Sequence, residues 1–469
     1  MKSKLLAIAS SLLFIVIVAF AARVAFAWIQ EREMPREALA IVPLAQETGN
    51  IAYSLVTGQG YSSPFRSNTG PTAWLPPVYP VLIAGIFLIC GPLSMASLNA
   101  SILLNIIFSA GTCIPIFFIG KRVGGVPLAA TAAWLWALFP NAIMLPYEWI
   151  WDTSMSALLG ALLLWATLLV ADTAKLRDWC VYGVFWGFSL LTNPALGSLF
   201  PPFLAWAGYR AAGRSPASSL PASQGTSQAS SQGNPEATPQ ASAEALAQTS
   251  APKTSRISRS WQRPVFAATI AILCCVPWTI RNYVQLHKFI PVRSNFAFEL
   301  WTGNNNIFDP HTGTAMSRIS KYGEVRQFTQ LGEIAFMEDK WRKATLFMRT
   351  HPQLVLKLEL ARVVTTWMGT QHVIADFMHT DFWLDRLVLI VNAIVLLGTV
   401  TGIILLYRRR NPYAFPLAAA PIFFPIIYYI THTSLRYRHP LDPVLMLLTA
   451  VALTAPFRGK TPVAQSQFS

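Results

Sequence analysis

The sequence begins with a long apolar run, LLAIASSLLFIVIVAFAARVAFAWI at residues 5–29, which follows Lys2 and Lys4. A hydrocarbon core about 30 Å thick is crossed by about 20 apolar residues in a helix. The run is long enough to span a bilayer, and it exceeds the roughly 7 to 15 residues of a signal-peptide core. The tripeptide AFA at residues 25–27 resembles a cleavage site, but later spans need a first helix to set their orientation. We therefore expect an uncleaved anchor.

The rest of the chain has the composition of a membrane protein. Of the 469 residues, 12% are charged and 53% are hydrophobic, whereas soluble globular proteins carry about 25% charged residues. This composition excludes an ordinary soluble enzyme. The net charge of +15 does not indicate nucleic acid, because membrane proteins concentrate Lys and Arg at the cytoplasmic ends of their helices. The sequence predicts an all-α polytopic membrane protein whose partners include the lipid bilayer and no nucleic acid.

Basic clusters predict the topology. If all of them are cytoplasmic, the apolar runs pair into about ten transmembrane helices with both termini in the cytoplasm. The clusters are Lys2/Lys4, Lys121-Arg122, Lys175/Arg177, the stretch 210–263, Arg408-Arg409-Arg410 and Arg458/Lys460. The predicted spans are 4–28, 97–120, 126–146, 153–172, 179–192, 195–209, 264–280, 384–407, 413–430 and 440–457.

Two apolar stretches do not fit a simple span. Residues 78–92 are short and end at Gly91-Pro92, so we expect an interfacial helix on the outer face. Residues 179–209 are divided by Asn193-Pro194 into two short helices. Basic residues flank this stretch on both sides and require an even number of crossings, which a re-entrant hairpin would also satisfy.

The chain is predicted to have three parts. Residues 1–210 form an N-terminal membrane region with a first outer loop at 30–77. Residues 211–263 are rich in Ser, Ala, Gln, Pro and Gly, which predicts a disordered cytoplasmic linker. Residues 264–469 form a C-terminal membrane region with a large outer loop at 282–383. Polar residues concentrate in these two long outer loops. This indicates either chemistry at the outer face of the membrane or loops that simply hold the polar residues of a membrane protein.

The first outer loop carries a series of motifs. Glu47 precedes IAYSLVTGQGY at residues 51–61, and PPVYP at residues 76–80 opens an apolar helix. This series resembles the first periplasmic loop of the GT-C membrane glycosyltransferases, in particular the protein mannosyltransferase and aminoarabinose-lipid A transferase superfamily with its RgtA-type bacterial members. Further motifs in the family's order are LTNP at 191–194, RSN at 293–295, GN at 303–304 and RYRHP at 436–440.

The resemblance implies a GT-C-like fold with juxtamembrane helices and a membrane glycosyltransferase of the bacterial inner (plasma) membrane. Such enzymes take a sugar from a polyprenyl-phosphate donor and pass it to an acceptor, here a glycolipid, a polysaccharide or a protein. No cofactor is expected. The alternatives are a transporter or flippase of a lipid-linked saccharide and a catalytically inactive relative. The inactive relative is favoured by two departures from the family's pattern. The chain has Leu44-Ala45 where the family often has Asp-Glu, and Leu75 where some relatives have Lys.

Glycosyl transfer from a lipid phosphate needs a carboxylate that takes a proton from the acceptor hydroxyl. Glu47 is the first candidate, because three residues along a helix bring a side chain back near the face on which the missing acids would lie. The other reading of Glu47 is a cap for the helix that follows. Asp152 and Glu148, one helical turn apart, form the second acidic site and could orient the acceptor or the base.

The reaction also needs cations for the departing phosphate. Arg436 and Arg438 lie just before a predicted span, where a guanidinium can bind two phosphate oxygens, and Arg281 and Arg293 are further candidates. Three outer aromatic residues, Tyr61, Trp74 and Tyr79, could stack on sugar or prenyl groups, although aromatics are also common at the membrane interface. The spacing of His372, Asp376 and His379 is compatible with a metal but is weak evidence, so we expect none.

Overall fold

The computed structural model of the chain describes residues 10–33, 44, 46–65, 68–213, 253–305, 323–369 and 383–457. In these residues the secondary structure is helical, with one isolated bridge between Ser62 and Pro71 and no strand. The helices are α2 (Leu12–Glu33), α4 (Glu47–Val56), α5 (Val78–Cys90), α6 (Met95–Gly111), α7 (Cys113–Ala137), α8 (Pro140–Glu148), α9 (Thr153–Val170), α10 (Leu176–Leu190), η1 (Pro194–Leu199), α11 (Phe200–Gly213), α13 (Lys253–Leu286), α14 (Phe296–Gly303), α15 (Glu324–Thr350), α16 (Pro352–Met368), α18 (Trp383–Arg408), α19 (Ala414–Phe423), α20 (Ile426–Ile430), α21 (Leu435–Arg438), η3 (His439–Leu441), α22 (Asp442–Thr454) and η4 (Ala455–Phe457).

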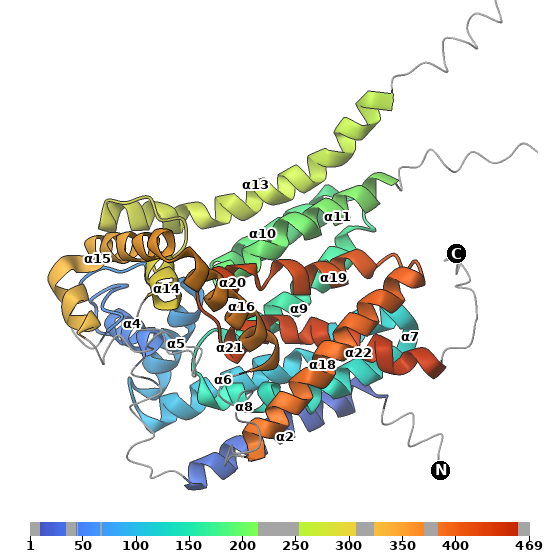
Figure 1. Cartoon of the computed structure of the whole chain (residues 1–469), viewed down its shortest axis with the longest axis horizontal. Coiled ribbons are helices and arrows are strands. Elements are labelled where there is room, and N and C mark those ends of the chain that lie inside the picture. The colour runs from blue at the N-terminus through green and yellow to red at the C-terminus, as the bar shows by residue number, and fades with distance from the viewer. Residues whose placement is uncertain are drawn as a thin grey trace, which may run out of the picture.

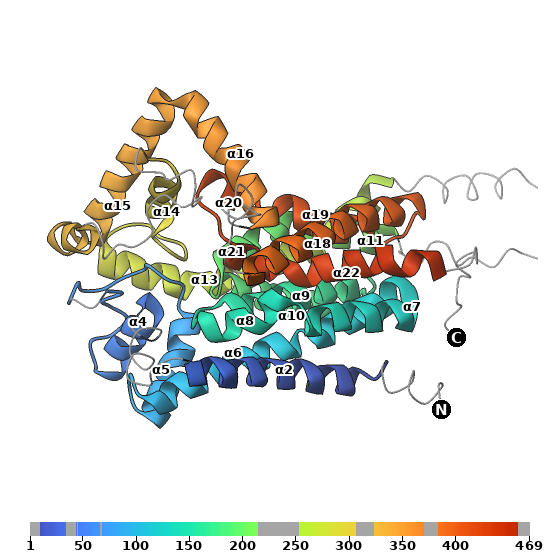
Figure 2. The ribbon, with the colours of Figure 1, turned by 60° about the horizontal axis from the view of Figure 1, so that its bottom comes forward.

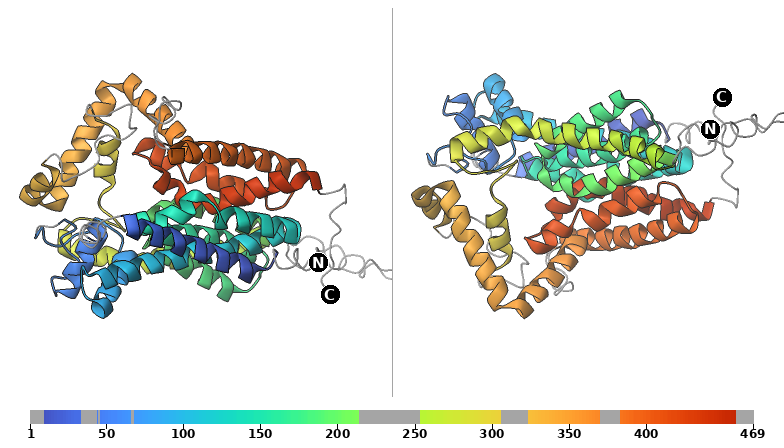
Figure 3. Two further views of the ribbon diagram at one scale, coloured as in Figure 1. Left: turned by 90° about the horizontal axis from the view of Figure 1, so that it is seen from below. Right: turned by 90° about the horizontal axis from the view of Figure 1, so that it is seen from above.

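Most long helices lie along one axis and form a bundle, while α4, α14, α15 and α16 gather at one end of it (Figures 1, 2 and 3). Five stretches in the described residues are long and apolar enough to cross a membrane, and two shorter apolar helices accompany them. The five are Leu12–Arg32, Met95–Ala137, Thr153–Val170, Trp261–Leu286 and Arg386–Arg408. The all-α polytopic membrane class is thus confirmed, and the number of about ten spans stays a prediction.

The chain reverses inside α7. Gly124 and Gly125 have non-helical backbone angles, and the φ of +83° at Gly125 is a conformation that favours glycine. The two arms touch at Gly120, where an added Cβ would lie 2.7 Å from the Cα of Ala129. The long apolar stretch is therefore a hairpin, and its turn lies where the sequence separates the spans 97–120 and 126–146.

Several basic segments meet at the end of the bundle away from α4 and α15. Arg122 forms an ion pair with Asp172 and donates from Nε to the Tyr413 hydroxyl at 3.0 Å. The guanidinium of Arg210 lies 5.8 Å from the centre of the same Tyr413 ring. Helix α2 begins and α22 ends at this end as well (Figure 2). That this end faces the cytoplasm stays a prediction.

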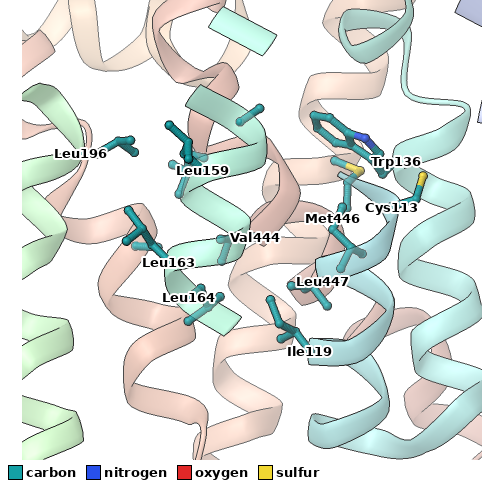
Figure 4. Close-up of a cluster of buried hydrophobic side chains, with 14 of the residues drawn as sticks. Cys113, Ile119, Trp136, Leu159, Leu163, Leu164, Leu196, Val444, Met446 and Leu447 are labelled. Atoms are coloured by element: carbon teal, nitrogen blue, oxygen red, sulfur yellow. The ribbon is translucent and has the colours of Figure 1, made fainter. Parts of the chain in front are cut away.

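The core of the bundle lies between α7, α9 and α22. Side chains of Ile119, Leu163 and Leu447 pack there together with the other labelled residues of Figure 4. Trp136 is fully buried in this cluster and donates from Nε1 to the Ser109 carbonyl at 2.8 Å. This hydrogen bond replaces the one that the indole N–H group would make to water. This packed region supports the polar end of the molecule.

The helices around the predicted linker extend further than expected. Helix α11 continues to Gly213, and α13 begins at Lys253, inside the predicted linker of 211–263. The predicted span started at residue 264 because it followed the apolar run, but the helix begins earlier and Pro264 lies in its interior. The rest of the linker lies outside the described residues. Helix α5 begins at Val78 as expected, and α10 and α11 are divided at Asn193; the interfacial position of α5 stays a prediction.

Candidate active site

The first outer loop is tied to α13 by Arg281. Its Nη1 donates to the Thr72 carbonyl at 2.5 Å, and its Nη2 donates to the Tyr61 carbonyl at 2.6 Å. Glu333 in α15 holds the same loop, because its carboxylate accepts from the Ala73 amide at 2.9 Å and from the Thr72 hydroxyl. Arg281 therefore organises the loop, a different role from the predicted phosphate contact.

Arg438 differs from its prediction in the same way. It is 1% exposed, and its Nε donates to Asp442 Oδ1 at 2.8 Å. Its remaining nitrogens donate to the Trp367 and Thr366 carbonyls at 2.8 and 3.3 Å and to Asn392 Oδ1 at 2.8 Å. A guanidinium that uses four of its five N–H groups on these partners joins α16, α18 and α22, and its burial leaves it inaccessible to a phosphate.

The three predicted stacking aromatics are also structural. The Tyr61 hydroxyl donates to the Leu75 carbonyl at 2.9 Å, and the Tyr79 hydroxyl donates to Asn105 Oδ1 at 2.8 Å. Trp74 is buried in an aromatic cluster with Phe65, Phe298 and Phe328. None of the three rings is exposed to a substrate, because all three side chains are buried and the two tyrosine hydroxyls are hydrogen-bonded within the protein.

Two acids and two arginines of the prediction do share one site. Glu47 begins α4, and Asp152 directly precedes α9. Burial raises the pKa of both carboxyl groups, and the charges of Arg436 and Arg293 partly offset this effect on each of them. Each arginine therefore lies within electrostatic range of each acid, although their sequence positions are far apart, and we call these four groups the charged centre.

A third acid, Glu299 in α14, completes the charged centre. Its carboxylate forms an ion pair with His432 Nδ1 at 2.9 Å and accepts from Arg293 Nη2 at 3.3 Å and from Asn295 Nδ2 at 3.0 Å. Burial alone would raise its pKa, but His432, Arg293 and Arg436 lower it to about 2. Glu299 is thus ionised at neutral pH and anchors the cations of the site.

Arg436 lies in an aromatic cage at the other side of this network. Its guanidinium carbon is 3.8 Å from the centre of the Trp151 ring and 4.4 Å from that of Trp149. Its Nη2 donates to the Tyr437 hydroxyl at 2.8 Å, and this hydroxyl lies 3.2 Å from His432 Nε2. The cage fixes the plane of the guanidinium by cation–π contacts.

In the described part of the chain, several buried polar atoms of this site, Nε1 of Trp151 included, have no hydrogen bond. Among the described residues, neither Oε2 of Glu47 nor Nη1 of Arg436 has a hydrogen bond. Buried polar atoms are nearly always hydrogen-bonded, so an unpaired acceptor and an unpaired donor in one charged centre need an explanation. A ligand that donates to the carboxylate and accepts from the guanidinium would satisfy both.

The LTNP motif supports Asp152. Oδ2 of Asp152 accepts from the Ser156 hydroxyl at 2.8 Å, and Ser156 accepts from Asn193 Nδ2 at 3.1 Å. Asn193 is itself fixed because its Oδ1 accepts from the Ala195 amide at 3.0 Å. The break between α10 and α11 therefore positions the second acid of the site.

Arg362 fixes α14 against the segment that carries His432. Its nitrogens donate to the Tyr429 and Ile430 carbonyls at 2.7 and 2.9 Å, and also to the Gly303 carbonyl. A side chain at Gly303 would collide with the Thr431 carbonyl, so only glycine permits this approach of the two backbones. Glu299 and His432 are thereby held in register.

The remaining candidates lie apart from this centre. Glu148 is exposed at the end of α8. His372, Asp376 and His379 lie outside the described residues. In the part of the chain that the structure describes, no three His, Cys, Asp or Glu side chains are grouped so as to hold a metal ion.

Four residues of the centre were not predicted as site residues: Glu299, His432, Trp149 and Trp151. Glu299 has a sequence signal, since it is the single acid in the apolar segment FAFELW at 296–301. Trp149 and Trp151 alternate in a segment whose backbone is extended at Trp149, and alternate residues of an extended chain lie on one face. His432 has no comparable signal.

Comparison with known proteins identifies a family region and the fold. Residues 75–222 match the family model described as dolichyl-phosphate-mannose-protein mannosyltransferase. No curated protein matches the chain.

Two crystal structures of the oligosaccharyltransferase of Archaeoglobus fulgidus are similar to the whole chain. The structure with Zn and sulfate has a TM-score of 0.50 and 12% sequence identity, and the alignment covers 49% of its chain. The apo form has a TM-score of 0.51 and 14% sequence identity, and the alignment covers 50% of its chain. Each alignment covers 95% of this chain. The chain therefore has the GT-C fold and spans about half the length of these structures.

Proposed function

From a chain with the GT-C fold and a mannosyltransferase-family region, we propose a membrane glycosyltransferase that moves a sugar from a polyprenyl-phosphate donor to an acceptor hydroxyl at the outer face of the membrane. The observation that carries this proposal is the pair of unsatisfied buried atoms, Oε2 of Glu47 and Nη1 of Arg436. An acceptor hydroxyl supplies the missing donor, and a phosphate oxygen supplies the missing acceptor.

In the proposed reaction Glu47 is the general base. Oε2 takes the proton of the acceptor hydroxyl while the hydroxyl oxygen bonds to the anomeric carbon, and the bond from that carbon to the phosphate oxygen breaks. The electron pair leaves with the prenyl phosphate, so the configuration at the anomeric carbon inverts. The raised pKa of Glu47 suits this role, because a base is most effective when its pKa approaches the working pH.

Arg436 binds the departing phosphate in this proposal. Nη1 points its unpaired N–H group at the developing charge, while the cage of Trp149 and Trp151 keeps the guanidinium in place. Donors that are oriented before the reaction stabilise developing charge at little reorganisation cost. Some relatives have a Lys at the position of Leu75, and in this proposal Arg436 supplies the positive charge that such a Lys would provide. Asp152 orients the acceptor beside Glu47.

The proposed orientation follows from the two ends of the bundle. The charged centre lies at the end that carries α4 and α14, and Lys and Arg clusters meet at the opposite end. Excess basic residues favour the cytoplasmic side, so the site would face the periplasm of a bacterial inner membrane with both termini in the cytoplasm. A transporter would place ionisable groups along a path near mid-bilayer, whereas this site is built from the outer segments.

The function can be tested in cells. We expect the cell-envelope glycans of otherwise identical bacteria with and without the gene to differ by one sugar, which mass spectrometry of envelope lipids, polysaccharides and proteins would reveal. Reintroduction of the gene should restore the sugar. Identical glycans, together with a changed distribution of a lipid-linked saccharide between the two leaflets, would point to the flippase alternative.

Arg436→Lys should weaken donor binding or turnover about 10- to 150-fold, which corresponds to the loss of a charge-assisted hydrogen bond of about 1.5 to 3 kcal/mol. Lysine keeps the charge but loses the planar fork that the aromatic cage orients. The measurement is the rate of sugar transfer from a purified polyprenyl-phosphate sugar. Arg342→Lys, at an exposed arginine of α15, is the control and should leave the rate unchanged. A normal rate for Arg436→Lys would move the phosphate contact to Arg293.

A further inference from the structure

A pocket of about 400 Å³ opens between the segment that follows α13 and helix α15. Its walls are mainly apolar and include Phe289, Ile290, Met337 and Trp341. Lys288 and Glu338 also line it, and their exposed side chains form an ion pair at 2.8 Å. This volume lies within the range of about 300 to 1,000 Å³ that is typical of small-molecule sites.

The pocket is connected to the charged centre through Arg293. Arg293 lines the pocket and donates to Glu299. From Glu299 the chain of polar contacts continues through His432 and Tyr437 to Arg436. The pocket is therefore at one end of this chain, and the unpaired nitrogen of Arg436 is at the other.

The two ends of this chain of polar contacts suit the two different substrates of the transfer. In a direct displacement the attacking oxygen and the leaving oxygen lie on opposite sides of the anomeric carbon. If the phosphate leaves toward Arg436, the acceptor approaches from the side of Arg293. The pocket is then the place for the part of the acceptor that does not react.

The walls of the pocket indicate what that part is. A sugar chain or a peptide needs several hydrogen-bonding groups, whereas most of this wall offers hydrocarbon and aromatic surface. Phe289 is 73% exposed and Trp341 is 49% exposed. Tyr283 and Val284 at the outer end of α13 are each 58% exposed, so apolar surface continues from an apolar, membrane-length helix to the pocket.

We propose that this pocket binds the apolar chain of a lipid acceptor, which makes the acceptor a glycolipid and not a polysaccharide or a protein. Lys288 and Arg293 would face the anionic or polar headgroup, and the headgroup hydroxyl would extend toward Glu47. This inference rests on the proposed function, since it assigns the pocket to one of the two substrates of the transfer.

The test is photo-crosslinking from the pocket. Met337→benzoylphenylalanine places a photoreactive ketone in the wall, and Leu346→benzoylphenylalanine places it on the same helix at an exposed position that does not line the pocket. The purified full chain is reconstituted in phosphatidylcholine vesicles that contain either the glycolipid fraction of the host envelope or polyprenyl phosphate. After irradiation, mass spectrometry identifies the adducts.

We expect a glycolipid adduct at position 337 at least tenfold stronger than at position 346. Ile334→Trp fills the pocket and should remove this adduct while the thermal unfolding midpoint stays normal. An adduct of polyprenyl phosphate at 337 with no glycolipid adduct would assign the pocket to the donor and overturn the proposal. Equal adducts at 337 and 346, or none, would also overturn it.

The same experiment separates this inference from the proposed function, because no sugar is transferred in it. A glycolipid adduct in a protein whose deletion leaves the envelope glycans unchanged would retain the pocket and reject the transferase. Normal transfer to the envelope glycolipid by the Ile334→Trp variant, with unaltered kinetics, would retain the transferase and reject the pocket.

Discussion

Glu47→Gln should lower the rate of sugar transfer by about 100- to 10,000-fold, the range expected for the loss of a positioned general base. Glutamine keeps the size of the side chain and its hydrogen-bonding capacity but cannot take a proton at neutral pH. The protein level and the thermal unfolding midpoint should stay normal, because Glu47 Oε2 has no partner among the described residues that the change would break. The measurement is single-turnover transfer from a polyprenyl-phosphate sugar.

The pH profile distinguishes a base from a merely structural carboxylate. A base works only when deprotonated, so the activity of the unaltered protein should fall as the pH drops through the pKa of Glu47. Burial raises that pKa, which places the fall above the ordinary carboxyl value of about 4.3. Glu47→Gln should abolish this acid limb, and Glu148→Gln, at an exposed acid outside the centre, should keep it. Unchanged turnover in Glu47→Gln would move the role of the base to Asp152.

Arg438→Met should lower the free energy of unfolding by about 3 to 5 kcal/mol, as expected when one partner of a buried ion pair is removed. The variant leaves Asp442, which is fully buried, without the cation at 2.8 Å, although His439 Nδ1 still lies 3.1 Å from its carboxylate. It also leaves the Trp367 carbonyl and Asn392 without their donor. Denaturant unfolding in phosphatidylcholine nanodiscs measures the loss.

A double variant supplies the control for this ion pair. Arg438→Met with Asp442→Leu removes both charges and should recover a large part of the lost stability, because apolar replacements of buried pairs are often tolerated. Arg436→Met, two residues away, should cost much less stability because its guanidinium has an unpaired nitrogen. Normal stability of Arg438→Met with lost donor affinity would instead restore the predicted phosphate contact.

The sequence was sufficient for the fold class and for several helix boundaries. The apolar runs and the basic clusters predicted the turn near Lys121-Arg122, and the structure has the reversal at Gly124 and Gly125. The start of the span predicted at residue 264 was less accurate, because α13 begins at Lys253 and Pro264 lies inside it. Length and hydropathy define where a helix is apolar, but they do not show how far a polar extension continues beyond the membrane.

The sequence predicted the charges of the site better than its aromatic residues. Glu47, Asp152, Arg293 and Arg436 were all among the charged candidates, and the arginines act on the charges of both acids, while their catalytic roles stay predictions. Arg438 could not be separated from Arg436, because the two lie in a helix of only 4 residues and the directions of their side chains depend on α16, α18 and α22. The sequence also did not show that Tyr61 packs inside the protein while Trp151 contacts Arg436, because this difference depends on their tertiary neighbours.

The site is assembled from both sides of residues 214–252. Glu47 and Asp152 precede this stretch, whereas Arg293, Glu299 and Arg436 follow it. During synthesis the two acids are therefore inserted long before the cations that act on their charges. A nearby cation lowers the pKa of a buried carboxyl group, so the arginines of the C-terminal half favour the charged form of these two acids. A chain that stops before Arg293 therefore lacks every cation of the charged centre, and this centre is completed only late in translation.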